Sequence, residues 1–188
     1  MSDLVSQAEE TLLKSKGMAF AEIEQTVFDL LSREIDYGEV YVQSTRSESF
    51  GLEDGIVKEG AFSVDAGIGV RALAGEKTGF AYSEDIRLDG LQQAAKAARS
   101  IAKKGSSRNA PAYNATQYPA LYEGVDPISS LSDAETVVLL RQVDSVARAQ
   151  DPRVKEVNVR ISASHESMLV MASDGTLAAD IRPLVRLD

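Results

Sequence analysis

The stretch YGEVYVQSTRSESFGLEDGIVKEGAFSV, from Tyr37 to Val64, decides the fold. Its β-branched and aromatic residues come in short runs, which predict strands over residues 37–45, 47–52 and 56–64. The pair Asp54-Gly55 separates the last two runs, and such a pair is typical of a tight hairpin because a type I′ turn needs two positive φ angles. We therefore expect antiparallel pairing within this stretch.

The β texture continues after Val64 and returns near the end of the chain. Strands are predicted over residues 68–73 and 78–82, and Gly67 and Gly69 indicate that a helix or another backbone comes close to the first of them. The residues after Pro152 predict further strands, at 157–161, 168–171 and 176–187, with a turn at Asp174-Gly175.

Helices flank these strands. Apolar stripes predict helices over Leu4–Lys16, Ala19–Glu34 and Leu88–Lys103. A fourth helix begins at a capping box formed by Ser132 and Glu135. The predicted buried faces of the third and fourth helices hold Leu91, Ala95, Ala98 and Ile101, and Leu139, Leu140, Val143, Val146 and Ala147.

These elements give an α+β fold class, with a mainly antiparallel sheet flanked by helices. The run Glu39-Val40-Tyr41-Val42 is similar to the later run Glu156-Val157-Asn158-Val159. Two repeated helix-plus-meander units are therefore an open alternative. We expect residues 1–188 to be an N-terminal α+β domain of a longer protein. Its sub-units are placed at 1–105 and 130–188, joined by a Pro-rich connection over 106–131.

Composition restricts the partners. The chain has 20 Lys and Arg against 29 Asp and Glu, a formal net charge of -9, and no run of basic residues that could follow a phosphate backbone. Direct binding to nucleic acid is therefore not expected. The N-terminus lacks the pattern of a signal peptide, and no stretch approaches the roughly 20 apolar residues of a membrane span. We expect a cytoplasmic protein without a membrane partner.

Few residues offer chemistry. The 188 residues include no Cys and one His, His165, which excludes a self-contained zinc site of several His or Cys ligands. His165-Glu166 begins like the H-E-x-x-H zinc motif, but Leu169 stands where the second His belongs. Gly75-Glu76-Lys77-Thr78 predicts a tight charged turn, because its spacing does not fit a phosphate-binding loop. We assign no catalytic, cofactor-binding or metal-binding residue to this chain.

Other charged and edge features keep more than one interpretation. The carboxylate pairs Glu9-Glu10, Glu53-Asp54 and Glu84-Asp85 lack the ligand spacing of a calcium loop and are interpreted as solvated charges. An exposed strand edge would be able to capture an extended peptide by strand addition, or to pair with another part of the protein or a second subunit. The sequence leaves these alternatives open.

Two groups of residues resemble a known family. The first runs from Asp36-Tyr37-Gly38-Glu39-Val40-Tyr41 through Gly67-Ile68-Gly69-Val70-Arg71 to Gly75-Glu76-Lys77-Thr78-Gly79-Phe80-Ala81-Tyr82. The second runs from Ala172-Ser173-Asp174-Gly175-Thr176 to Leu187. Together they resemble the N-terminal region of the TldD/PmbA metallopeptidases, also called modulators of DNA gyrase, and favour the TldD branch.

The resemblance implies a zinc metallopeptidase that hydrolyses unfolded peptides as a heterodimer with a PmbA/TldE-like partner subunit. The family's metal motif, His-Glu with another His four residues after the Glu and a later Cys, lies in a C-terminal domain, and no position of this chain matches it. Zinc is therefore expected in that domain. This chain is expected to shape substrate access and subunit assembly. The alternative is a non-enzymatic peptide- or protein-binding module of the gyrase-modulator type.

Overall fold

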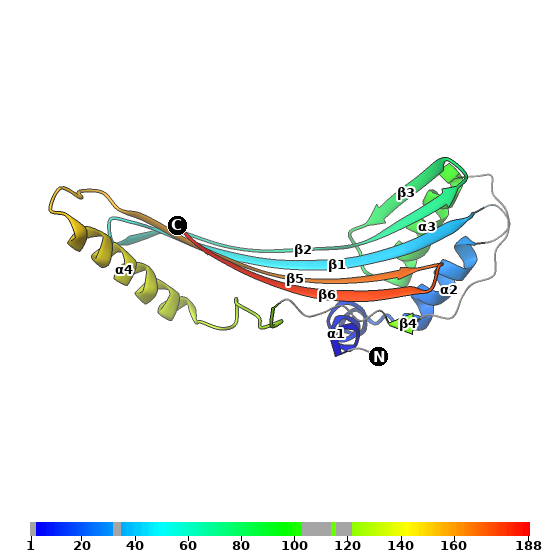
Figure 1. Ribbon diagram of the computed structural model, residues 1–188, viewed down its shortest axis with the longest axis horizontal. Helices are drawn as coiled ribbons and strands as arrows, with labels where there is room; N and C mark the ends of the chain where they lie inside the picture. The colour runs from blue at the N-terminus through cyan, green and yellow to red at the C-terminus, as the bar shows by residue number, and fades with distance from the viewer. Residues whose placement is uncertain (1–2, 32–34, 103–113, 116–121) are drawn as a thin grey trace. The chain divides into compact units, whose positions relative to one another are not determined.

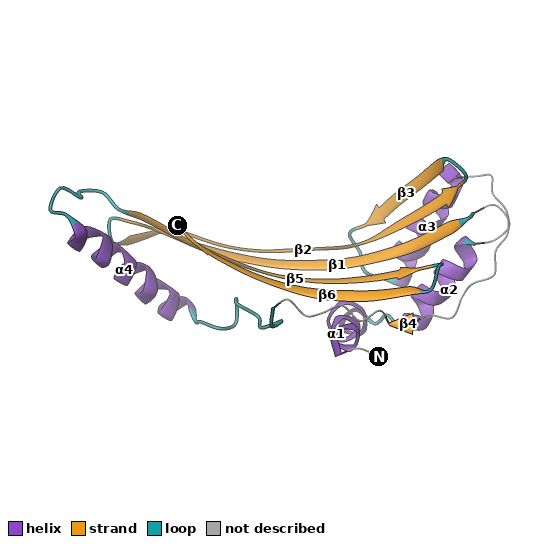
Figure 2. Cartoon of the chain, in the orientation of Figure 1, coloured by secondary structure: helices purple, strands orange, loops and turns teal. Residues whose placement is uncertain are grey.

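A computed structural model describes residues 3–31, 35–102, 114–115 and 122–188, and it confirms the α+β class with a mainly antiparallel sheet. The sheet order is β3-β2-β1-β5-β6-β4, and helices flank it (Figures 1 and 2). The elements are α1 Asp3–Ala8, α2 Phe20–Leu30, β1 Tyr37–Glu53, β2 Ile56–Ala74, β3 Lys77–Ser83, α3 Leu88–Ala102, β4 Asn114–Ala115, α4 Asp133–Gln150, β5 Asn158–Ala172 and β6 Thr176–Leu187.

Two hairpins build the centre of the sheet. β1 turns into β2 at Asp54 and Gly55, whose φ angles of 49° and 78° confirm the predicted turn. β5 turns into β6 at the predicted Asp174-Gly175 pair, where Gly175 has a φ of 94°. β1 and β5 are neighbours although a long connection separates them in sequence. Backbone bonds from Ser173 to Gly38 and from Asp54 to Val157 join them near both ends.

The strands are longer than predicted, and the expected breaks within them are wrong. β1 continues through residue 46 and β2 through residues 65–67, and β5 is also unbroken from Asn158 to Ala172. Gly67 permits this continuity in β2. A Cβ at Gly67 would lie 2.8 Å from the carbonyl oxygen of Ser83, so glycine lets the neighbouring backbone approach, as predicted.

Residue contacts divide the chain into two compact units. Unit 1 comprises Met1–Ser44, Asp65–Ala120 and Ser167–Ile181, and unit 2 comprises Thr45–Val64, Leu121–Glu166 and Arg182–Asp188. β1, β2, β5 and β6 each contribute residues to both units, so this grouping follows the sheet rather than the order of the chain. The sub-unit boundaries placed at residues 1–105 and 130–188 stay predictions. So does the expectation that the chain is an N-terminal domain of a longer protein.

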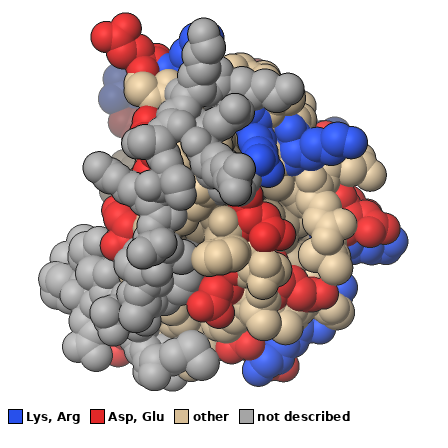
Figure 3. Space-filling model, turned by 90° about the vertical axis from the view of Figure 1, so that its right-hand side faces the viewer, with Lys and Arg blue, Asp and Glu red and all other residues tan. Residues whose placement is uncertain are grey.

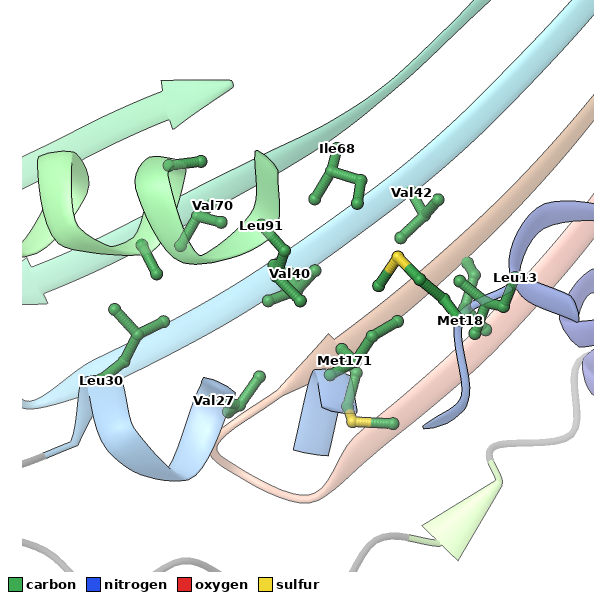
Figure 4. Packing of buried hydrophobic residues seen from close by; sticks show 14 of the residues in the cluster. Leu13, Met18, Val27, Leu30, Val40, Val42, Ile68, Val70, Leu91 and Met171 are labelled. Atoms are coloured by element: carbon green, nitrogen blue, oxygen red, sulfur yellow. The ribbon is translucent and has the colours of Figure 1, made fainter. Parts of the chain in front are cut away.

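Unit 1 has a core between its helices and one face of its sheet. An apolar stripe of α2 is buried at Ile23, Val27 and Leu30, as is Leu31 just after the helix, and Leu91 is buried on α3. Figure 4 shows these helices packed against side chains from β1, β2 and β5, namely Val40, Val42, Ile68, Val70 and Met171. α3 lies closely against β3, because a Cβ at Gly79 would collide with the carbonyl oxygen of Ala98.

The helices of unit 1 agree in part with those predicted from the sequence. The first predicted helix begins as α1 and continues through a π-helical turn, Glu9–Leu13, and a 3₁₀ turn, Lys14–Lys16. Gly17 ends it with a φ of 75°, as a C-terminal glycine should. The prediction that Ile101 is buried on α3 is wrong, since its side chain is 56% exposed. The predicted ends at residues 34 and 103 lie outside the described residues.

Unit 2 has a small core beneath α4. Its buried apolar residues, among those described, are Leu52 of β1, Leu140 of α4, and Val157 and Val159 at the start of the β5 region. The predicted capping box begins α4: the Ser132 hydroxyl accepts from the Glu135 N–H at 3.4 Å, and the Ser132 N–H donates to the Glu135 carboxylate at 2.8 Å.

The predicted buried face of α4 needs one correction. Val146 is 61% exposed, whereas Asp144 is buried. Arg148 explains the exchange, since its guanidinium bonds to Asp144 at 3.1 Å and to Asp54 of the β1–β2 turn at 2.6 Å. The helix is therefore turned so that a charged pair, rather than a valine, faces the hairpin.

The predicted connection at 106–131 falls mostly outside the described residues. Of its described part, residues 114–115 form β4, which pairs in parallel with β6, and residues 122–131 form neither helix nor strand. No helix in the described ranges is long and apolar enough to cross a membrane. Where Figure 3 draws described residues, acidic and basic side chains are interspersed on the face shown.

Candidate functional site

Unit 2 carries a groove of about 390 Å³ with a mainly apolar lining. Three strands form its floor, and the segment before α4 and the first turn of that helix form its wall. We call it the unit 2 groove. Its lining residues are Glu48, Phe50, Glu123, Val125, Pro127, Ile128, Ser130, Leu131, Thr136, Ile161, Ala163, Pro183 and Val185.

Strand alternation places these floor residues. Side chains at alternate positions of a strand share one face, so Glu48 and Phe50 face the same side as Leu52, which packs in the core under α4. Ile161 of β5 borders the same core. Pro183 fits β6 because, among the described strands, β6 is an edge of the sheet in unit 2, and edge strands tolerate a proline, which has no backbone N–H.

Asp126 holds the wall of the groove against β1. Its carboxylate accepts from the Arg46 guanidinium at 2.7 Å and from the Ile128 N–H at 3.0 Å, and its carbonyl accepts from the Ser130 hydroxyl at 2.6 Å. Burial raises the pKa of Asp126, but the bonds from Arg46 and Ile128 outweigh it and leave this pKa below its usual value. Asp126 is thus an ionised anchor.

Glu48 is the half-buried carboxylate of the groove floor. Burial raises its pKa, and the negative charges of Asp133 and Asp126 add to this effect. Arg46, two residues earlier on the same face of β1, is already bonded to Asp126. A bound cation would lower the cost of keeping Glu48 ionised.

His165 lies in β5 and does not fit a metal site. Its Nδ1 is 3.4 Å from the Arg46 guanidinium, and its Nε2 is buried without a partner among the described residues. A neighbouring guanidinium disfavours a second cation at the same imidazole. The described residues also contain no group of three or more His, Cys, Asp or Glu that could hold a metal. The zinc that the family resemblance implies therefore has no fitting ligand set there.

A second polar cluster lies in unit 1. The Tyr37 hydroxyl donates to Glu39 at 2.7 Å, and Arg71 donates to the same carboxylate oxygen at 2.9 Å while its guanidinium lies 5.6 Å from the centre of the Tyr37 ring. Burial, followed by the bond to Glu39, raises the pKa of Tyr37 to about 12. These contacts join Tyr37 and Glu39 of β1 to Arg71 of β2, so the cluster ties the two strands together.

The other motifs singled out in the sequence have local roles. Gly75 has a φ of 58° in the turn between β2 and β3, and a strand follows, as the predicted tight turn requires. Asp54 accepts from the Val157 N–H and from Arg148, so it is not simply solvated.

Sequence reasoning missed the groove. Its wall comes from residues 123–131, which have no periodicity that would place them over a strand. The alternation of Arg46, Glu48, Phe50 and Leu52 was the available signal, because a carboxylate next to large apolar side chains on one face indicates a partly buried charge.

Comparison with known proteins gives two consecutive family matches. Residues 38–102 match the family model described as PmbA/TldA metallopeptidase domain 1, and residues 126–188 match the PmbA/TldA metallopeptidase central domain. A curated relative from Haemophilus influenzae, named metalloprotease TldD homolog, is 46% identical over 98% of this chain. A relative of the same name from Buchnera aphidicola is 42% identical over 94% of it. The chain spans 39% and 37% of these relatives.

Solved structures share the fold. A protein from Thermotoga maritima described as a putative modulator of a DNA gyrase superposes with a TM-score of 0.69, 16% identity, and coverage of 90% of this chain and 39% of that one. TldE from Thermococcus kodakarensis gives a TM-score of 0.67 at 16% identity, covering 88% of this chain and 38% of that one.

Proposed function

Because the chain belongs to the PmbA/TldD metallopeptidase family, we propose that it is the non-catalytic N-terminal part of a cytoplasmic metallopeptidase subunit. In this role it shapes the access of unfolded peptides to a catalytic domain and contributes to assembly with a PmbA/TldE-like partner subunit. The observation that carries the proposal is the order of the matches. Domain 1 and the central domain follow one another within a stretch that equals 39% of a relative named as a metalloprotease.

The chemistry of the chain supports this division of labour. A metallopeptidase needs several metal ligands and a general base. This chain has one His and no Cys, and the His lies beside a guanidinium. Zinc is therefore expected in a C-terminal catalytic domain. This chain contributes walls of the substrate path and surfaces for subunit assembly.

A metal and cleavage assay on the 188-residue chain tests the non-catalytic assignment. The purified chain is incubated with zinc, passed through gel filtration, analysed for bound metal, and then mixed with a fluorogenic unfolded peptide. We expect substoichiometric zinc and no cleavage above buffer, while circular dichroism confirms that the chain is folded. Stoichiometric zinc, or cleavage that a chelator abolishes, would overturn the proposal.

A second candidate, a peptide- or protein-binding module, is favoured by the outer edge of β2. β3 pairs with β2 only from Ile68 onwards, so in unit 2 residues 56–64 form an edge among the described strands. Phe62 and Val64 are each 59% exposed on that edge. Such an edge is suited to strand addition. Absence of amide shifts at residues 56–64 with millimolar unfolded peptide would argue against this candidate.

A further inference from the structure

The unit 2 groove keeps apolar side chains exposed to solvent at its rim. Val125 is 58% exposed and Val185 is 55% exposed, and Leu131 is also exposed. Their neighbours Phe50 and Ile161 are only partly buried. Clustered apolar side chains at the mouth of a groove are typical of a binding surface, because an apolar ligand removes them from water.

The ionisable side chains that line the groove are negatively charged. Among the described residues that line it, Glu48 and Glu123 are ionisable, and both are acidic. Asp133, at the start of α4, adds negative charge near Glu48. The Arg46 guanidinium on the same face bonds to Asp126 at 2.7 Å, so this cation is engaged by the wall of the groove. A ligand that fits must therefore combine apolar surface with positive charge.

We propose that the unit 2 groove binds an extended peptide segment that carries a large apolar side chain directly beside a Lys or Arg. The apolar side chain lies against Phe50, Val125 and Val185, and the cationic side chain pairs with the Glu48 carboxylate. The proposal rests on the proposed function, since it names which sequences the access-shaping part of the subunit prefers.

The size of the groove and its exposed rim favour a peptide segment over a folded protein as the ligand. A volume of about 390 Å³ lies at the lower end of the roughly 300–1,000 Å³ typical of ligand pockets, so it holds one or two side chains and excludes a folded surface. Backbone pairing along a sheet edge has little sequence preference. The groove adds a preference that depends on side chains.

Binding of labelled peptides to the 188-residue chain tests the proposal. The probes are three flexible Gly-Ser peptides that contain Leu-Lys, Leu-Glu or Ser-Lys at their centre, and the measurement is fluorescence anisotropy. An ion pair at a protein surface is worth up to about 1 kcal/mol, which corresponds to about fivefold in Kd. We therefore expect the Leu-Lys peptide to bind about fivefold more tightly than the Leu-Glu peptide, and also more tightly than the Ser-Lys peptide.

A matched pair of variants assigns the preference to Glu48. Glu48→Gln should reduce the difference between the Leu-Lys and Leu-Glu peptides to less than about twofold, because the groove loses its half-buried charge. Glu53→Gln removes the same charge from an exposed position on the alternate face of β1 and should leave the fivefold preference intact. Circular dichroism checks that both variants are folded. A preference that is unchanged in Glu48→Gln would overturn the proposal.

Amide shifts in the wild-type chain give a result that does not depend on a variant. We expect the Leu-Lys peptide to shift the amides of Phe50, Ala163 and Val185. Shifts confined to residues 56–64 would place the peptide on the β2 edge and overturn the proposal. Hexylammonium binding as tightly as the peptide would assign the groove to small amines and overturn it as well.

The outcomes separate this inference from the proposed function. A chain that neither holds zinc nor cleaves peptides, yet shows no Leu-Lys preference, would overturn the groove assignment alone. A chain that cleaves peptides with its own zinc would overturn the proposed function, whatever its binding preference.

Discussion

Replacing Leu140 by Ala tests whether unit 2 has a core of its own. Leu140 is fully buried, and it packs with Leu52, Val157 and Val159. Leu→Ala changes at buried sites cost about 2–5 kcal/mol, of which part comes from the cavity that remains. Because this core is small, we expect about 3 kcal/mol of local stability to be lost.

Hydrogen exchange measures this loss at individual amides. A loss of about 3 kcal/mol corresponds to an increase of about 150-fold in the exchange rate of amides that open with unit 2, such as Leu52 and Val159. Amides in the core of unit 1, such as Val40 and Val70, should keep their protection, because their side chains belong to a separate cluster. The matched control is Val146→Ala on the exposed side of α4, which should cost less than about 0.5 kcal/mol.

Two results would refute this reasoning. Equal loss of protection in both units would show that they unfold together, so that the small core is not an independent source of stability. No loss at Leu52 would show that α4 does not hold the hairpin.

Further predictions concern unit 1. Gly79→Ala should destabilise the chain by about 2 kcal/mol or more in urea unfolding, because the new Cβ would collide with the Ala98 carbonyl oxygen. Gly69→Ala should cost less, because its Cβ would meet only the ring of Phe80, which can move. Similar costs would contradict the packing of α3 on β3. The folded state raises the pKa of Tyr37 to about 12, so the stability this group contributes is fully present below pH 10 and is lost as pH rises towards 12. The unfolding free energy of Tyr37→Phe should therefore fall less than that of the wild type between pH 10 and pH 12. The same slope of unfolding free energy against pH in both proteins would contradict this.

Local signals in the sequence predicted the turns and helix starts. Asp54-Gly55 and the capping box at Ser132 act through residues within a few positions of each other, so their chemistry can be read along the chain. The strand predicted from Val157 likewise agrees with β5, and Val157 and Val159 are buried.

Long-range contacts explain what the sequence did not predict. Val146 has the spacing of a buried residue, but the bonds of Arg148 to Asp144 and Asp54 set a different rotation of α4. Two hydrogen-bonding residues 94 positions apart leave no local pattern. The wall of the groove was missed for the same reason, because Asp126 reaches β1 through Arg46 from 80 positions away.

A chimaera gives the most direct test of the claim that this chain is the non-catalytic, access-shaping part of a metallopeptidase subunit. Residues 1–188 replace the matching stretch of the Haemophilus influenzae relative, and chelator-sensitive cleavage of an unfolded peptide is measured in the presence of a PmbA/TldE-like subunit. We predict that the relative without this stretch is inactive, that the chimaera recovers cleavage, and that the 188-residue chain alone cleaves nothing. Full activity of the relative without the stretch would contradict the account.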